Sequence, residues 1–246
     1  MEDCEMSFTA LETYLLPLKN IFAEDDVNEV MINKPGEAWV EKKGDQRLEK
    51  IPEIDLDHLL GLGRLVAQST DQKISEENPL LSATLPNGYR IQVVFPPACE
   101  PGMVAYAIRK GSTMSLSLDE YAKMGAFDNT TTKEKINEDD IILSKYLKQK
   151  KIKEFLRHAV KCKKNIIISG GTSTGKTTFT NAALSEIPEH ERLITVEDAR
   201  EVLLDKHPNR VHLLVSKGGQ GRAKVTTQDL IEACLRLRPD RIIVGE

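Results

Sequence analysis

The chain has 246 residues, of which 40% are hydrophobic and 29% are charged, and its formal net charge is −4 at pH 7. These proportions are typical of a soluble globular protein, and the length suffices for two domains that each bury a core. No run approaches the ~18 consecutive apolar residues of a membrane span. The acidic start leads into no apolar signal core, so we expect a cytoplasmic protein. The net charge excludes a general attraction to nucleic acid or to anionic lipid.

The first hundred or so residues alternate short strand patterns with turns, and one helix interrupts them. An apolar stripe predicts this helix from Asp55 to Ser69. Asn87-Gly88 favours the positive φ angles of a tight hairpin between two strands. Together these patterns predict an α+β domain over residues 1–111, with helices on one face of an antiparallel sheet. Its strands are expected at residues 30–33, 38–41, 47–51, 80–85, 89–95 and 104–109.

The composition changes after residue 111. Residues 112–147 are polar, weakly patterned and rich in turn formers, which predicts a linker with one short helix near Leu118–Met124. Residues 148–246 then alternate helices and strands, which predicts an α/β domain whose parallel sheet is covered on both faces. Its helices are expected at residues 151–162, 176–186 and 226–237, and its strands at 166–169, 193–197, 211–215 and 241–244.

A glycine-rich loop directly follows the expected strand at residues 166–169. It has the pattern Gly-x-x-x-x-Gly-Lys-Thr between a strand and a helix, which is the context of a phosphate-binding loop. Its glycines let consecutive N–H groups point at phosphate oxygens, and the helix N-terminus adds partial positive charge. Lys176 supplies a full charge for the β- and γ-phosphates, Thr177 a hydroxyl for Mg²⁺, and Thr178 a contact near the α-phosphate. The predicted nucleotide-binding residues are Gly170, Gly171, Thr172, Ser173, Thr174, Gly175, Lys176, Thr177 and Thr178.

Two acidic residues stand where further strands of this domain end. Glu197 closes the strand at residues 193–197, and Glu246 follows the strand at residues 241–244. In a parallel sheet these ends lie on one edge, which also carries the phosphate-binding loop. We therefore expect both carboxylates at the γ-phosphate, where an acid holds the Mg²⁺ shell or polarises the attacking water.

The four cysteines are too scattered to suggest a shared metal ion. They form no Cys-x-x-Cys pair, which argues against a metal site and favours reduced thiols that pack as small hydrophobic residues. These cysteines are Cys4, Cys99, Cys162 and Cys234.

Several segments together resemble the type II and type IV secretion traffic ATPases, most closely the hexameric ring ATPase of type IV secretion and conjugation systems. The phosphate-binding segment Ile168–Thr178, the acidic box Thr195–Asp198 and the acidic strand Arg238–Glu246 carry the resemblance. Leu85–Val94 and Val104–Lys110 resemble the paired N-domain strands of the family. The likeness therefore spans nearly the whole chain.

The resemblance implies a PAS-like N-terminal domain joined to a RecA-like P-loop NTPase domain, with ATP between them and six subunits in a ring. Arg90 and Arg109 match family arginines that reach the nucleotide phosphates. A guanidinium fork suits the charge that spreads over γ-phosphate oxygens. The family continues past the acidic (Walker B) strand into a histidine-containing box, whereas this sequence stops at Glu246. We therefore expect a truncated RecA-like domain.

The histidines of this chain match no such box, and we interpret each as a surface or helix-face residue. They are His58, His158, His190, His207 and His212.

The leading hypothesis is an ATPase that powers type IV secretion of protein or DNA. It assigns catalysis to Lys176, Glu197, Glu246, Arg90 and Arg109, with Thr177 and Glu246 at Mg²⁺ and with ATP and Mg²⁺ as cofactors. The expected partners are the other subunits of a homo-hexamer and inner-membrane secretion-channel components. Peripheral association with the inner face of the bacterial inner membrane stays open. We find no dedicated nucleic-acid-binding motif.

Two other functions also use a phosphate-binding loop. The chain is alternatively an assembly platform that binds ATP with negligible turnover. A small-molecule kinase also uses a phosphate-binding loop, but residues 186–246 contain no resemblance to an arginine-rich acceptor lid. The basic, glycine-rich residues 217–224 are interpreted as a connecting loop, with contact to a partner as the alternative.

Overall fold

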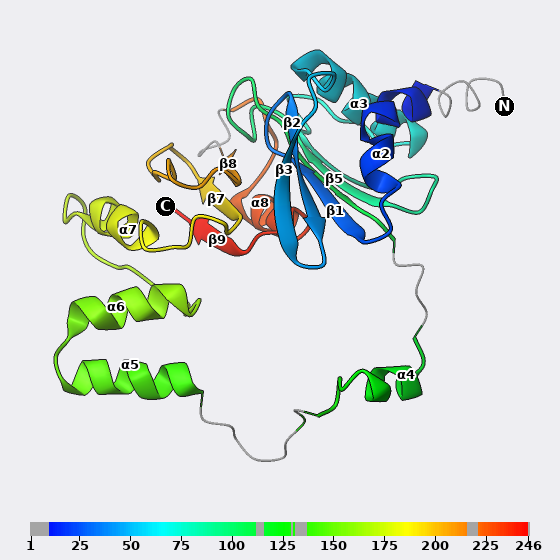
Figure 1. The fold of residues 1–246 in the computed structure, drawn as a ribbon. Coiled ribbons are helices and arrows are strands. Elements are labelled where there is room, and N and C mark those ends of the chain that lie inside the picture. The colour runs from blue at the N-terminus through cyan, green and yellow to red at the C-terminus, as the bar shows by residue number, and fades with distance from the viewer. Residues whose placement is uncertain (1–9, 112–115, 129, 131–136, 216–220, 246) are drawn as a thin grey trace. The chain divides into compact units, whose positions relative to one another are not determined.

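The computed structural model describes residues 10–111, 116–128, 130, 137–215 and 221–245. The chain forms two compact units, one of residues 1–111 with 189–246 and one of residues 112–188. We call them the sheet unit and the helical unit (Figure 1). No described helix is both long and apolar enough to cross a membrane.

A six-stranded antiparallel sheet forms the centre of the sheet unit, with strand order β3-β2-β1-β6-β5-β4. The predicted strands are confirmed, with ends that differ by a few residues. The predicted hairpin joins β4 to β5, because Gly88 takes a φ of +81° and the N–H of Leu85 donates to the carbonyl of Tyr89 at 2.7 Å. The strands are β1 (Val27–Ile32), β2 (Glu37–Lys42), β3 (Asp45–Lys50), β4 (Leu80–Thr84), β5 (Arg90–Val94) and β6 (Ala105–Arg109).

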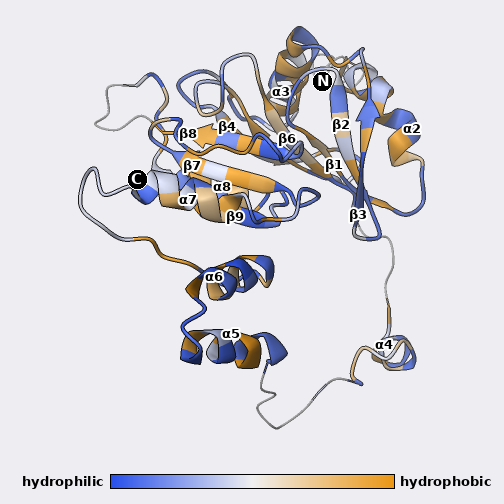
Figure 2. Cartoon of the chain, turned by 60° about the vertical axis from the view of Figure 1, so that its left-hand side comes forward, coloured by the Kyte–Doolittle hydropathy of each residue, from blue (hydrophilic) through white to orange (hydrophobic). Residues whose placement is uncertain are grey.

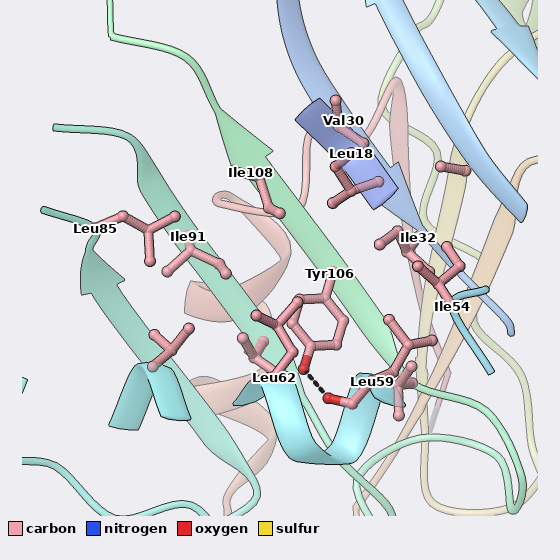
Figure 3. Packing of buried hydrophobic residues seen from close by; sticks show 14 of the residues in the cluster. Leu18, Val30, Ile32, Ile54, Leu59, Leu62, Leu85, Ile91, Tyr106 and Ile108 are labelled. Carbon is pink, nitrogen blue, oxygen red and sulfur yellow. Dashed lines mark hydrogen bonds between the residues drawn. The ribbon is translucent and has the colours of Figure 1, made fainter. Parts of the chain in front are cut away.

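Helices cover one face of this sheet. The longest is α3 (Leu56–Ser69), which begins where predicted because the Asp55 side chain accepts a hydrogen bond from the N–H of His58 at 2.7 Å. The short helices η1 (Leu16–Leu18) and α2 (Lys19–Phe22) precede the sheet. Figure 3 shows the core between α3 and the sheet, where the buried Tyr106 hydroxyl donates to the Leu59 carbonyl at 2.5 Å.

A three-stranded parallel sheet contributes a second core to the sheet unit. Its order is β8-β7-β9, and both strand pairs are parallel, as predicted. The predicted helix before the last strand is also present. Figure 2 shows the hydrophobic character of β7, all five residues of which are buried. The buried core joins apolar residues of β1, β5 and β6 to those of these elements. The elements are β7 (Leu193–Glu197), β8 (Arg210–Leu214), α8 (Thr227–Cys234) and β9 (Arg241–Val244).

A buried arginine connects the two sheets of this unit. Arg192, just before β7, has no exposed surface. Its guanidinium donates to the Leu237 carbonyl at 2.9 Å, to Asn33 Oδ1 at 2.6 Å and to Asn209 Oδ1. Burial lowers the pKa of Arg192 to about 9, because the charged form loses its water. Since Asn33 follows β1, this cluster fixes the parallel sheet to the antiparallel one.

The helical unit contains four described helices, and one of them was missed by the sequence analysis. The prediction of a weakly patterned linker is wrong for residues 138–147, which belong to α5. The polar residues that suggested turns begin this helix instead, because the Asn137 side chain accepts from the N–H of Asp139 at 2.9 Å. The three acids that follow favour the positive end of the helix dipole. The helices are α4 (Leu118–Lys123), α5 (Glu138–Lys148), α6 (Ile152–Lys161) and α7 (Lys176–Leu184).

The strand expected at residues 166–169 is not formed. These residues have no regular secondary structure, and Ile167 is 94% exposed. A strand needs a hydrogen-bonded neighbour, and the described residues of the helical unit form no strand that could pair with this one. The apolar run is therefore an irregular segment that precedes the phosphate-binding loop.

Candidate nucleotide-binding site

The loop at residues 170–175, which the sequence predicts to bind phosphate, leads directly into α7, and we keep the name phosphate-binding loop for it. Gly175 is the residue before the helix, and its φ of +85° is in the left-handed region that glycine tolerates. Lys176 Nζ donates to the Gly171 carbonyl at 2.9 Å, and Thr174 Oγ1 donates to the same oxygen at 2.8 Å. These contacts curl the loop around the lysine at the N-terminus of α7.

The loop is both tightly folded and accessible. A Cβ atom at Gly170 would lie 2.7 Å from Thr174 Oγ1, so a larger residue there would require the Thr174 side chain to move. Residues 170–175 are exposed. The first N–H groups of a helix have no acceptor within the helix and carry partial positive charge. The backbone, Lys176 and Thr177 therefore provide the donors and the hydroxyl that a nucleotide phosphate with Mg²⁺ requires.

Two of the predicted arginines face each other in the sheet unit. Arg90 on β5 and Arg109 on β6 are direct cross-strand partners, and Glu29 on β1 is the partner of Arg109 on the other side. Burial raises the pKa of Glu29, although Arg109 opposes this effect. Like charges directly opposite each other destabilise a sheet. An anion bound to both guanidinium groups would therefore reduce the repulsion between Arg90 and Arg109.

Both arginines line a cavity of about 1070 Å³ in the sheet unit. Arg236 and Arg238, from the turn between α8 and β9, line the same cavity. Arg236 donates to Ser82 Oγ at 2.8 Å, and Arg238 donates to Asp240 Oδ1 at 2.9 Å. Glu29 is the only acid among the lining residues, and Arg238 is also paired with Asp240 outside the lining, so the lining holds more arginines than carboxyl groups. This excess of arginine suits a phosphate-bearing ligand.

The sequence analysis gave no role to Arg236 and Arg238. The sequence does contain an Arg-x-Arg pattern directly before Pro239. The pattern does not indicate a cavity, because many of the other lining residues lie on β4 and β5, which are distant in sequence.

Glu197 is placed inside a buried hydrogen-bond network. Its Oε2 accepts from Thr195 Oγ1 at 2.6 Å and lies 3.5 Å from His212 Nδ1. Its Oε1 accepts from the N–H groups of Glu201 at 2.9 Å and Val202 at 2.7 Å. Although burial opposes ionisation, these bonds together lower the pKa of Glu197 to about 2. The carboxylate is thus ionised and holds the turn that follows β7.

The end of β9 lies beside Glu197. The N–H of Gly245 donates to the Val196 carbonyl at 2.8 Å, and a Cβ at Gly245 would lie 3.3 Å from Glu197 Cγ. The expected meeting of these two strand ends is confirmed. Glu246 itself lies outside the described residues, so its predicted position at Mg²⁺ stays a prediction.

The interpretation of the histidines is wrong for His207 and His212, each of which is 2% exposed. His212 is buried because it lies on β8 opposite Thr195, whose hydroxyl is 2.9 Å from its Nδ1. Its Nε2 has no hydrogen-bond partner among the described residues.

The described part of the basic loop is bound to the sheet unit. Arg222 forms an ion pair with Glu76 at 2.6 Å, and the N–H of Lys224 donates to the Glu77 carbonyl at 2.8 Å. Residues 217–220 of this loop lie outside the described residues.

Comparison with known proteins decides the family. The family model described as "Type II/IV secretion system protein" matches residues 15–246. The chain belongs to this family. The type IV secretion system protein VirB11 of Bartonella quintana is 38% identical over 246 residues, which are 95% of this chain and 69% of that protein. The PtlH protein of Bordetella pertussis is 36% identical, with 96% and 70% covered.

A solved structure of a family member has the same fold. It is the VirB11 ATPase of the Brucella suis type IV secretion system in complex with sulphate. The TM-score is 0.92 at 36% identity, and the match covers 100% of this chain and 71% of that one. The mixed α/β fold of this secretion-system protein is thereby established. The family match also includes every residue predicted for the nucleotide site.

Proposed function

We propose that this chain binds and hydrolyses MgATP as the traffic ATPase of a type IV secretion system. The conformation of the loop at residues 170–178, with Lys176 at the N-terminus of α7, is the single observation that carries the proposal. The names of the similar proteins, which include a VirB11 ATPase of a type IV secretion system, support the same function.

The loop holds the phosphates in this proposal. Its N–H groups and the ammonium of Lys176 bind the β- and γ-phosphate oxygens, Thr177 offers its hydroxyl to Mg²⁺, and Thr178 contacts the α-phosphate region. When bound, Mg²⁺ would neutralise part of the negative charge that develops between the β- and γ-phosphates. Glu246 is the proposed second protein group at the metal.

The sheet unit supplies the remaining charges. Arg90 and Arg109 bind phosphate oxygens as a fork, and the facing guanidinium groups support this role. Both carboxylate oxygens of Glu197 already accept hydrogen bonds within the protein. We therefore propose that Glu197 acts indirectly: it holds the turn after β7, and this turn positions the attacking water and the metal shell. Glu197 is thus a positioning residue in the proposed reaction.

The proposal includes the expected assembly. A PAS-like domain at residues 1–111, a connecting segment at residues 112–147 that includes most of α5, and a RecA-like domain from residue 148 form one subunit of a homo-hexamer. Its partners are components of the secretion channel at the inner face of the inner membrane, and the place of action is the cytoplasm. The cargo is protein or DNA.

Measuring nucleotide-dependent stability and turnover together tests this function. MgATP at a hundredfold excess over Kd is expected to stabilise the protein by about 2.7 kcal/mol. Lys176→Ala is expected to remove most of this effect, because the substitution deletes the ammonium group that binds the phosphates. Lys145→Ala, an exposed lysine of the same unit, is the matched control.

Phosphate release by the same proteins measures turnover. Arg109→Gln is expected to lower the rate about 10²-fold or more, because it removes a donor to developing charge, whereas Arg64→Gln on the exposed side of α3 leaves it unchanged. An equal thermal shift in wild type and Lys176→Ala contradicts nucleotide binding at the loop. Binding without phosphate release by the wild type favours the assembly platform instead.

A further inference from the structure

Three potential metal ligands meet in the helical unit, outside the phosphate-binding loop. Asp139, His158 and Cys162 each offer one ligand atom, and these atoms all lie within 4.8 Å of one another. His158 Nε2 is 2.8 Å from Asp139 Oδ1. All three residues are half-buried. We propose that they form a binding site for a thiophilic divalent cation, namely Zn²⁺.

The helical hairpin of α5 and α6 brings these residues together. His158 and Cys162 are four residues apart along α6 and its last turn, so they lie on the same helix face. Asp139 belongs to the first turn of α5. Figure 1 shows α5 and α6 side by side, and their short connection turns the chain back at Lys150, whose φ is +56°. The start of α5 therefore lies opposite the end of α6.

The chemistry of the three donors selects the metal. Imidazole nitrogen, thiolate sulfur and carboxylate oxygen are the ligands of zinc, at bond lengths of about 2.0–2.3 Å. Ligand atoms around a tetrahedral ion of that size are roughly 3–4 Å apart. Atoms within 4.8 Å of one another reach this arrangement by small side-chain rotations. Mg²⁺ and Ca²⁺ prefer ligand sets made entirely of oxygen, so they do not match this cluster. Water completes the fourth position.

The surroundings keep the three groups available. The ring of Tyr146 contacts His158 edge-on, at a centroid distance of 6.3 Å, which limits rotation of the imidazole. Lys164 Nζ lies 2.6 Å from Asp140 Oδ1, so the lysine is paired with the neighbouring acid rather than with Asp139. A histidine–aspartate ion pair accounts for two residues of the cluster but does not require a thiol at the same place.

The spacing of the cysteines in the sequence gives no indication of this proposed metal site. A search for cysteine pairs finds nothing near Cys162, whose neighbouring donor is a histidine four residues earlier. The third ligand comes from α5, a helix that the sequence analysis missed. A metal at this point would fasten α5 to α6 and stabilise the helical unit, independently of nucleotide binding.

Metal binding to the full 246-residue chain tests the proposal. After equilibration with Zn²⁺ and removal of free metal, we expect one zinc ion per chain by elemental analysis. Loss of even an outer-shell partner weakens zinc binding by roughly 10–100-fold. We therefore expect His158→Gln, Cys162→Ser and Asp139→Asn each to weaken it by at least about 100-fold. Asp140→Asn and the exposed His190→Gln are matched controls that retain the metal.

Cobalt spectroscopy on the wild type provides a second readout that does not depend on the folding of a variant. Co²⁺ is expected to give a thiolate-to-metal charge-transfer band and the visible bands of a tetrahedral ion, and Cys162→Ser should remove the former. Absence of the thiolate band in wild type, or zinc retained in Cys162→Ser, would overturn the proposal. The cluster would then be an ion pair beside a free thiol.

Discussion

The sheet unit and the helical unit hold their candidate functional groups in different ways. In the sheet unit, Glu197 and Arg192 are buried and fixed by hydrogen bonds, which come from the adjoining turn for Glu197 and from distant segments for Arg192. In the helical unit, the phosphate-binding loop is exposed and its shape depends on backbone angles such as the φ of Gly175. Side-chain substitutions should therefore affect the sheet unit most, and backbone strain should affect the helical unit most.

The largest expected effect tests the buried arginine. Arg192→Ala should destabilise the sheet unit by about 3 kcal/mol or more, because it leaves a cavity and removes the donor to the Leu237 carbonyl and to Asn33 Oδ1. Urea unfolding followed by the fluorescence of Trp39, the chain's single tryptophan, reports on this unit. Arg157→Ala is the matched control in the helical unit.

The control arginine is exposed and pairs with Glu186 at 2.7 Å. Ion pairs at the surface contribute little to stability, so Arg157→Ala should leave the unfolding curve unchanged. An equally small effect of Arg192→Ala would contradict the view that this buried arginine joins the two sheets.

The second effect is a pH dependence that belongs to the sheet unit. The pKa of Glu197 is lowered from 4.5 to about 2, which corresponds to roughly 3 kcal/mol. A depressed pKa stabilises the folded state above the unfolded value, and this contribution is lost as the pH falls from 4.5 toward 2. Wild type should therefore lose more stability than Glu197→Gln between pH 7 and pH 3.

Trp39 fluorescence at several pH values measures this difference. Glu53→Gln, an exposed acid of the same unit, should keep the pH dependence of the wild type. If Glu197→Gln and wild type lose stability in parallel, the hydrogen bonds to Glu197 do not hold it ionised.

The two units also differ in how far the sequence predicted them. Strands β7 and β9 were predicted with their observed ends, and the phosphate-binding loop was predicted with its helix, because periodicity and glycine spacing are local signals. The Arg192 cluster was not predictable, since Arg192 and Asn33 are 159 positions apart. The position of Arg236 in the cavity likewise depends on Ser82, its hydrogen-bond acceptor, which is 154 positions away in the sequence.

The errors in the helical unit have a different cause. The strand at residues 166–169 was predicted from apolar composition, although a strand also requires a partner. Helix α5 was missed because Asn137 and its acids were interpreted as turn formers, whereas the same residues favour a helix N-terminus. In both cases the residues were compatible with two structures. The absence of a described partner decided against the strand, and the hydrogen bond from the N–H of Asp139 to the Asn137 side chain begins the helix.

The smallest expected effect tests backbone strain in the helical unit. Gly175→Ala should weaken the start of α7 by about 1 kcal/mol, because a side chain disfavours a φ of +85°. No atom lies within 4 Å of the added Cβ, so the cost comes from the backbone angle alone. Hydrogen exchange of the α7 amides measures this local stability in a unit that contains no tryptophan.

Gly171→Ala is the control within the same loop. Its Cβ would meet Thr174 Cγ2 at 3.8 Å, an ordinary van der Waals contact, and its φ does not lie in the left-handed region. We expect exchange in α7 to be about fivefold faster in Gly175→Ala and unchanged in Gly171→Ala. Equal exchange in the two variants would show that the helix start tolerates strain, and that the backbone angle of Gly175 does not set the shape of the loop.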